Sequence, residues 1–245
     1  ISNSWEIGST KINIGSGSGQ LNQGENSVAL GNQTGNLNQG SSSIAIGDNA
    51  GNINQGNYSI STGYQAGESN QGENSIAIGY EAGTDNQGSN SVAIGIDTGA
   101  IFQGTSSVAI GNQAAYTGQG QFSVAIGVST ATNSQGINSI AIGNTSAYNN
   151  QGNNSIAFGS YSGQNNQGTS SISIGTNAGN NNQGTNAIAI GTNAGQVNQH
   201  NSSIILNASG SSLNSTTQNS FYVNPIRNDN TQSKVCLLYT SPSPR

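Results

Sequence analysis

The stretch 71–86, QGENSIAIGYEAGTDN, contains the pattern that decides the fold. Its first residue is a glutamine that recurs every 16 residues, without interruption, from Gln23 to Gln199. A fixed period of this kind indicates one short supersecondary unit stacked on itself. In such an array each unit contacts only its neighbours, so the molecule is a rod and not a globule around a single core. The sequence therefore predicts a solenoid with one coil per repeat.

The first half of each repeat predicts one β-strand. The run SIAIG at 75–79 alternates with a period of two, which is typical of a strand with one apolar face. The first apolar column is β-branched in every repeat, and such residues suit a pleated surface. We expect both apolar columns to point into the coil. The columns begin with Val28, Ile44 and Ile60 and with Leu30, Ile46 and Thr62, and they continue at the same spacing.

The opposite face of this strand is small throughout, with serine, alanine and glycine in successive columns. Glycine at a fixed place in every coil indicates a positive φ or a close approach of another backbone. We therefore expect a second chain to lie against this face, the alternative being an ordinary solvated surface. The candidate oligomer contacts are Ser75, Ala77, Gly79, Ser91, Ala93, Gly95, Ser139, Ala141 and Gly143.

The second half of each repeat predicts turns and corners. One small position, represented by Thr34, Ala50 and Ala66, is the candidate for a further inward column, and its neighbours vary among polar residues. The Asn-Gln-Gly corner closes the coil, and stacked glutamine and asparagine side chains can hydrogen-bond from coil to coil. We expect an all-β, parallel β-solenoid of about 13 coils, on the order of 60 Å long.

Charge is scarce, and its distribution excludes one class of partner. Lysine and arginine together number 4, and none lies between Gln23 and Asn198. Without cations the surface cannot hold phosphates, so we expect no nucleic-acid binding. The acids in this stretch are scattered along it. No apolar run approaches the roughly 18 residues of a transmembrane helix, so we expect no membrane insertion by this segment.

The sequence predicts no enzyme. His200 stands alone where the other repeats have glycine, and we interpret it as a substitution at the end of the array and not as a general base. No histidine or cysteine cluster offers metal ligands, and the glycine-rich loops lack the lysine of a phosphate cradle. We therefore expect no catalytic residue, no metal site and no cofactor.

The motif NSIAIG at 74–79 and again at 138–143 resembles the head repeats of YadA-like trimeric autotransporter adhesins. The resemblance covers about residues 12–207. It implies a left-handed parallel β-roll in which three chains pack side by side through the small-residue strand. It also implies a homotrimer at a cell or virion surface, outside the cell.

The C-terminal part of the sequence has a different character. Residues 219–227, NSFYVNPIR, resemble the junction before an endosialidase-type intramolecular chaperone in fibre proteins of phages and large DNA viruses. Residues 236–245, CLLYTSPSPR, resemble the translation of a sequencing adapter and contain the single cysteine. We expect a fragment edge at 1–6, head repeats at 7–210, a junction at 211–235 and an adapter-derived tail at 236–245.

Two functions fit a long uncharged solenoid. The first is a structural surface fibre or adhesin-like head segment that attaches to a host cell, receptor or glycan through outward side chains. The second is ice binding, for which the best threonine column reads Thr34, Ala50, Ala66, Ala82, Thr98, Ala114 and Thr130. The candidate receptor or glycan contacts of the fibre are Tyr64, Tyr80, Tyr116 and Tyr148.

Overall fold

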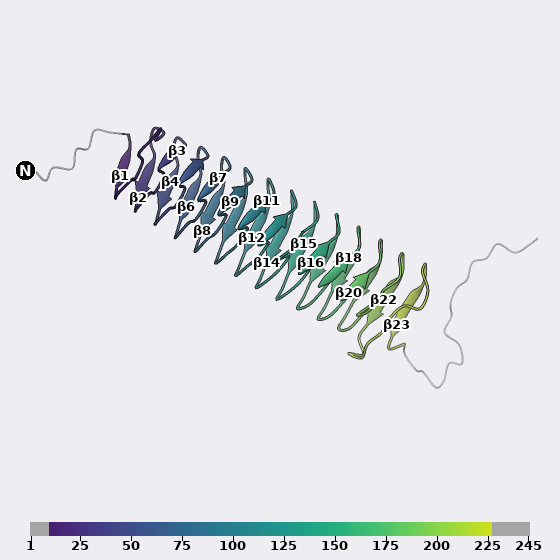
Figure 1. Cartoon of the computed structure of the whole chain (residues 1–245). Coiled ribbons are helices and arrows are strands. Elements are labelled where there is room, and N and C mark those ends of the chain that lie inside the picture. The colour runs from purple at the N-terminus through teal and green to yellow at the C-terminus, as the bar shows by residue number, and fades with distance from the viewer. Residues whose placement is uncertain (1–9, 227–245) are drawn as a thin grey trace, which may run out of the picture.

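The computed structural model describes residues 10–226, which form a rod of stacked coils (Figure 1). Each full coil adds a strand or an isolated bridge to each of two walls, and none of the described residues is helical. The all-β parallel solenoid of about 13 turns with a repeat of ~16 residues is therefore confirmed. The fragment edge at 1–6 and the tail at 236–245 lie outside the described residues.

The first wall is one continuous 14-stranded sheet. Each strand pairs in parallel with the strand of the next coil. Its strands are β1 (Ile12–Ile14), β2 (Val28–Leu30), β4 (Ile44–Ile46), β6 (Ile60–Thr62), β8 (Ile76–Ile78), β10 (Val92–Ile94), β12 (Val108–Ile110), β14 (Val124–Ile126), β15 (Ile140–Ile142), β17 (Ile156–Phe158), β19 (Ile172–Ile174), β21 (Ile188–Ile190), β22 (Ile204–Asn207) and β23 (Phe221–Asn224).

The second wall is divided into a 6-stranded and a 3-stranded sheet. Between them, around Asn133, only isolated bridges connect successive coils. Its strands are β3 (Leu37–Gln39), β5 (Ile53–Gln55), β7 (Ser69–Gln71), β9 (Asp85–Gln87), β11 (Ile101–Gln103), β13 (Thr117–Gln119), β16 (Asn149–Gln151), β18 (Asn165–Gln167) and β20 (Asn181–Gln183).

The repeat sets the strand register. We number the positions of a coil from 1, its glutamine, to 16, so that Gln71 is position 1 and Asn86 is position 16. Ile76 pairs with Val92 and Ile78 with Ile94, so like positions stack on like. The last pair departs from this spacing, because β23 joins the sheet with Phe221 opposite Ile204. The sheet therefore extends beyond residue 210, and part of the segment predicted as a junction belongs to the solenoid.

Tight corners are made by a recurring left-handed backbone. In one coil Asn74, Glu81 and Asn86 have φ of 54°, 51° and 58°, and Gly83 has φ of 57°. The same four positions have positive φ in almost every coil. Asparagine and glycine tolerate this conformation better than other residues. The asparagine and glycine content of the chain therefore follows from how sharply each coil must turn.

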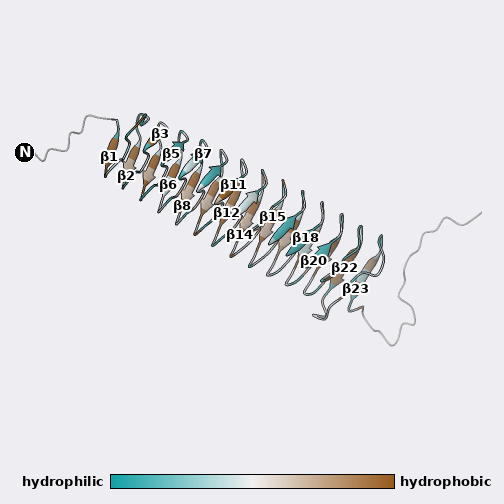
Figure 2. Cartoon of the chain, viewed as in Figure 1, coloured by the Kyte–Doolittle hydropathy of each residue, from teal (hydrophilic) through white to brown (hydrophobic). Residues whose placement is uncertain are grey.

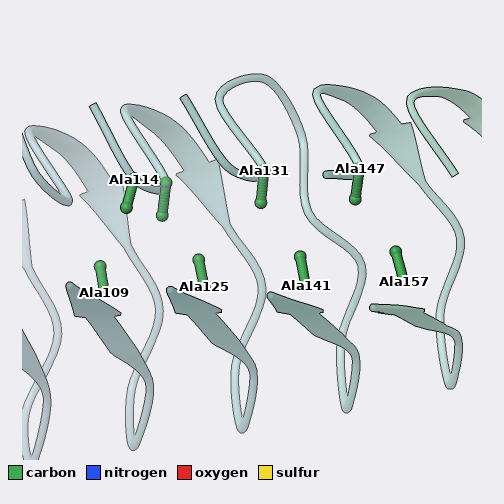
Figure 3. Close-up of a cluster of buried hydrophobic side chains, with 8 residues drawn as sticks. Ala109, Ala114, Ala125, Ala131, Ala141, Ala147 and Ala157 are labelled. Atoms are coloured by element: carbon green, nitrogen blue, oxygen red, sulfur yellow. The ribbon is translucent and has the colours of Figure 1, made fainter. Parts of the chain in front are cut away.

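The core has the opposite sidedness to the one predicted. Ala77 and Ser75 are fully buried inside the coil, whereas Ile76 and Ile78 lie on the outer surface. The expectation that the two apolar columns point inward is therefore wrong. The reason is width: a Cβ placed on Gly83 would lie only 3.3 Å from the Cβ of Ala77 across the coil. Alanines of the first wall, such as Ala125 and Ala141, face alanines of the turn that leads to the second wall, such as Ala131 and Ala147, and together they fill this narrow space (Figure 3).

Candidate interaction surfaces

The small residues predicted to face a second chain lie inside their own chain. Serine at position 5 and alanine at position 7 are buried inside the coils of their own chain, so a second chain cannot contact them. The prediction that they contact another chain is wrong for Ser75, Ala77, Ser91, Ala93, Ser139 and Ala141. Their smallness serves the narrow interior and not an interface.

The glycines at position 9 form the expected close approach, but within one chain. A Cβ on Gly79 would overlap the carbonyl oxygen of Gly95 in the next coil. The φ of Gly79 is 131°, a conformation that residues with a side chain rarely adopt. Gly95 and Gly143 meet the following coil in the same way. The neighbouring backbone that these glycines admit is therefore the next coil.

The glutamine column spans the interior and connects the two walls. Gln71 Nε2 donates to the carbonyl oxygen of Ile60 at 2.9 Å, and Gln103 Nε2 donates to that of Val92 at 2.8 Å. Both glutamines are buried. Some also form a ladder, as where Gln87 Nε2 donates to Gln103 Oε1 at 3.0 Å. The structural role predicted for this column is confirmed, with the side chains inside the coil and not at its corner.

Some interior acceptors are left without a donor. The Oε1 atoms of Gln23, Gln39, Gln151 and Gln167 are buried and have no hydrogen-bond partner. Two other coils provide one, because they carry serine in place of alanine at position 7. There Ser61 Oγ donates to Gln71 Oε1 at 2.7 Å, and Ser173 Oγ donates to Gln183 Oε1 at 2.6 Å. The interior is therefore a polar core, and whether its glutamine Oε1 atoms have a hydrogen-bond donor differs from coil to coil.

The outer side of the first wall is a continuous apolar surface, which we call the apolar face. It consists of the side chains at positions 6 and 8 of all 14 strands of that sheet. Thr62 is its only polar member, and none of its members is charged. In Figure 2 the strands of this wall are brown along most of the rod. Sequence reasoning missed this surface because it assigned these columns to the core.

The outer side of the second wall is largely polar. Asparagine side chains at position 16 form ladders, with Asn38 Nδ2 donating to Asn54 Oδ1 and Asn54 Nδ2 to Asn70 Oδ1, both at 2.9 Å. A similar ladder runs toward the C-terminal end from Asn150 to Asn198. The predicted coil-to-coil amide ladders are thus confirmed. Exposed Phe102 lies between the two ladders.

The four candidate tyrosines fall into two locations. Tyr64 and Tyr80 occupy position 10 in consecutive coils, where their rings stack with centroids 5.1 Å apart. This position follows the apolar face directly. Tyr116 and Tyr148 occupy position 14, before the second wall, and are half-buried. The structure therefore brings Tyr64 and Tyr80 together but keeps the other two apart.

Weak electrostatic effects accompany the stacked pair. A hydrogen bond to the Glu81 carboxylate raises the pKa of Tyr80, because it favours the protonated phenol. Burial raises the pKa of Glu68, and a hydrogen bond from Gln65 partly offsets this by lowering it.

Within residues 10–226 no group of three histidine, cysteine or acidic side chains could hold a metal ion. His200, predicted to be structural, lies 3.0 Å through Nδ1 from Ser215 Oγ.

The C-terminal end of the interior is closed by larger side chains. Ile205 takes the place of alanine at position 7, and Tyr222 packs against the same cluster. The Tyr222 hydroxyl accepts hydrogen bonds from the backbone N–H of Thr216 at 2.9 Å and of Thr217 at 3.2 Å. The Ser220 hydroxyl, followed by the hydroxyls of Thr216 and Thr217 and the N–H of Thr216, lowers the pKa of Tyr222 to about 7. Tyr222 therefore caps the described solenoid.

Comparison with known families gives one match, to the YadA head domain repeat (2 copies). It covers residues 71–98, 119–146 and 183–194. These segments are similar to YadA head repeats. Heads of this kind are surface-exposed structural adhesin domains and are typically not catalytic. A search of curated proteins found no match.

The head repeats occupy coils in which the apolar face is complete. Residues 71–98 contain β8 and β10, and residues 119–146 contain β14 and β15.

The chaperone junction suggested by 219–227 contains β23, whose pairing with β22 places it in the sheet. The chaperone domain itself stays a prediction. None of the residues from 10 to 226 belongs to an apolar helix of membrane-spanning length.

The threonine column considered for ice binding is not accessible. Thr34, Thr98 and Thr130 are fully buried at position 12, where their hydroxyls donate to carbonyl oxygens of Gly47, Gly111 and Gly143 in the next coil. A buried hydroxyl that is already bonded cannot order water at the surface. The structure therefore removes the column on which the ice-binding hypothesis depended.

Proposed function

We propose that this chain is a structural segment of a homotrimeric surface fibre, with an adhesin-like role, and that the apolar face forms the interface between its copies. The observation that carries the proposal is that face itself, which runs uncharged along the whole described rod within a chain that contains segments similar to YadA head repeats. Monomeric soluble proteins rarely expose a continuous apolar patch of such length. This length of exposed apolar surface therefore favours an interface with a partner that has the same coil spacing.

The size of the apolar face is sufficient for a stable interface. At 25 cal/mol per Å², fully burying one aliphatic side chain corresponds to roughly 60–120 Å² of apolar area. With about a third of each side chain exposed, the two columns together offer on the order of 500–1,000 Å² per chain. Stable protein interfaces bury about 800 Å² per partner. A second copy of the chain supplies a matching area with the same coil spacing.

The oligomer is tested by placing a charge on each wall in turn. Ile78 on the apolar face and Ile53 on the second wall are equally exposed, at 38%. In Ile78→Glu we expect the oligomer to dissociate, because each copy would bury an unpaired carboxylate. The matched variant Ile53→Glu should remain assembled, because its side chain stays in water.

Sedimentation equilibrium of the full chain and both variants measures the outcome. A wild-type chain that stays monomeric at micromolar concentration would contradict the proposal. So would equal assembly of the two variants.

The attachment surface in this proposal is the side of the rod that the trimer leaves in solvent. Tyr116 and Tyr148 lie there, beside the second wall, together with exposed Phe102. Aromatic side chains of this kind stack on sugar rings and on apolar groups of receptors. A glycan array probed with the labelled chain tests this step. We expect Tyr116→Ser to lose a signal that Tyr116→Phe, which keeps the ring, retains, and an array with no signal removes the glycan part of the proposal.

A further inference from the structure

Large exposed side chains flank the apolar face at its two edges. One edge is position 4, two residues before the outward side chain at position 6, and the other is position 10, two residues after position 8. Position 4 is asparagine or serine in every 16-residue coil except two. The exceptions are Tyr58 and Phe122, whose side chains are 65% and 58% exposed.

The same two coils also carry a large side chain at the opposite edge. In the coil of Tyr58, position 10 is Tyr64, which is 42% exposed. In the coil of Phe122, position 10 is Val128, which is 49% exposed. Elsewhere position 10 is polar or small, apart from Tyr80 and Ile96, which follow Tyr64 in consecutive coils. Each aromatic residue at one edge therefore has a bulky counterpart at the same height on the other edge.

The backbone makes these aromatic residues unfavourable in an isolated chain. Tyr58 and Phe122 both have φ of 57°, the left-handed conformation that asparagine tolerates and bulky residues avoid. Both rings also lie in water. Within one chain a strand separates the two members of each pair, β6 for Tyr58 and Tyr64 and β14 for Phe122 and Val128, so they lie at opposite edges of the apolar face. Their unfavourable placement is compensated only if something outside the chain covers them.

A ring of three chains brings the two edges together. In a cyclic trimer the three apolar faces surround the axis, and the position-10 edge of each face meets the position-4 edge of the next. Such interfaces are heterologous, and rotation about an axis parallel to the rod keeps every residue at its own height. Residues of the same coil therefore meet across each boundary between chains.

We infer that Tyr58 contacts Tyr64 of the neighbouring copy and that Phe122 contacts Val128 of the neighbouring copy, so that these two pairs set the register of the trimer. The inference rests on the proposed homotrimer and adds to it the residues that align the chains. The two columns of the apolar face cannot do so alone, since they are nearly identical from coil to coil. A slip by one coil, about 4.8 Å, would preserve most of their contacts, and in one direction it would set Tyr58 against Tyr80. In either direction it would set Phe122 against asparagine, at Asn112 or Asn144, so the pair of Phe122 and Val128 is the one that excludes every slip.

The C-terminal end offers a third contact of the same kind. A shallow pocket of about 370 Å³ lies at the position-8 to position-10 edge of the last coils. Ile190, Leu206 and Val223 line it from the sheet, with Ala208 and Pro225 at its rim. Phe221, at the same height and 58% exposed, lies toward the opposite edge. The same symmetry places the Phe221 ring of one copy at the pocket of the next.

Disulfide cross-linking of the full chain tests the first pair. We expect the double variant Tyr58→Cys, Tyr64→Cys, with Cys236→Ser to remove the native thiol, to form a covalent trimer on oxidation, seen on a non-reducing denaturing gel. Each single-cysteine variant should give none, because the two edges differ. Tyr58→Cys with Ile96→Cys, two coils out of register, is the matched control and should also give none.

Several results would overturn the register. An assembled oligomer without the 58–64 cross-link would do so, as would equal cross-linking of the out-of-register control. Dimers linked by Tyr58→Cys alone would indicate a two-fold arrangement instead. A wild-type chain that does not assemble would contradict the proposed trimer itself, which sedimentation shows before any cross-linking.

The pair of Phe122 and Val128 is tested by substitution and measurement of trimer association, with no cross-link. Phe122→Asn and Val128→Asn introduce the residue that other coils carry at these positions, so each monomer should fold. We expect each variant to weaken the trimer association constant at least tenfold, and the double variant to be little worse than either single variant. Additive losses, or no loss, would contradict the pairing. A gain in the thermal stability of the monomer with Phe122→Asn would agree with relief of its backbone conformation.

Discussion

The interior of the coil and the apolar face are two sides of the same strand, yet they follow opposite rules. Inside, serine, alanine and glutamine are buried and hydrogen-bonded. Outside, isoleucine and valine are repeated in every coil and remain partly exposed. In an ordinary domain these two sets would exchange places. The difference shows that the chain folds by filling a narrow polar interior and keeps its large apolar side chains for contacts outside it.

The most direct test of this difference changes one interior side chain and one outer side chain of the same strand. Ala125→Leu should destabilise the fold by more than about 3 kcal/mol, because the interior facing Ala131 has no room for extra carbons. The adjacent change Ile126→Leu, on the apolar face, should alter the stability of the single chain by less than about 0.5 kcal/mol. Thermal unfolding followed by circular dichroism measures both. Equal effects would mean that the two sides do not differ in packing.

A second test compares an amide inside the coil with one outside. Gln103→Met keeps the length of the side chain but removes the bond to the carbonyl oxygen of Val92 and the acceptor for Gln87. We expect a loss of about 1–3 kcal/mol, the cost of leaving buried polar groups unpaired. Asn166→Ala breaks two bonds of an exposed ladder and should cost less, about 0.5–1 kcal/mol. Denaturant titration of both variants decides whether burial sets the difference.

A third test sharpens the comparison by improving the interior. Ala157→Ser places a hydroxyl where Ser61 and Ser173 provide one in other coils, and it should donate to the orphaned Oε1 of Gln167. We expect a gain of about 0.5–1.5 kcal/mol in unfolding free energy. Ala93→Ser is the control, because Gln103 Oε1 already accepts from Gln87. A loss of stability in Ala157→Ser would mean that the interior tolerates no added atom there.

The smallest expected effect is at the end of the rod, where Tyr222 closes the interior. Its folded pKa of about 7 lies below the ordinary value of 10.0. The ionised phenol is therefore favoured in the folded state, and its contribution should be complete above pH 10 and lost as the pH falls through 7. We expect the C-terminal coils to gain protection from hydrogen exchange between pH 7 and 10. Tyr222→Phe should remove this dependence, and an unchanged profile in that variant would contradict the assignment.

Several features were predictable because they depend only on periodicity. The glutamine spacing from Gln23 to Gln199 predicted parallel pairing of like positions, and the pairs of Ile76 with Val92 and Ile78 with Ile94 confirm it. Amide ladders were predictable for the same reason, because equal side chains stack when the period is exact to the residue. The extension of the sheet to β23 was not predictable, since that strand breaks the 16-residue spacing.

The candidate interaction residues were predicted less well, and the reason is physical. Ser75 and Ala77 were assigned to an interface because small residues permit close approach, but the approach occurs inside the chain. A signal was present in the sequence: a coil of 16 residues with four sharp turns has little interior width. The pairing of Tyr58 with Tyr64 required knowing that positions 4 and 10 flank one face at the same height.

The sequence by itself determined that this chain is a parallel β-solenoid, because a repeat without insertions forces every coil to copy the one before it. Only the tertiary structure decided which side of each strand is the inside. Alternation along a strand defines two faces but does not say which one turns inward. That choice depends on the width of the coil. Except at Ile205, which closes the C-terminal end, the interior holds alanine, serine, threonine and extended glutamine and leaves isoleucine outside.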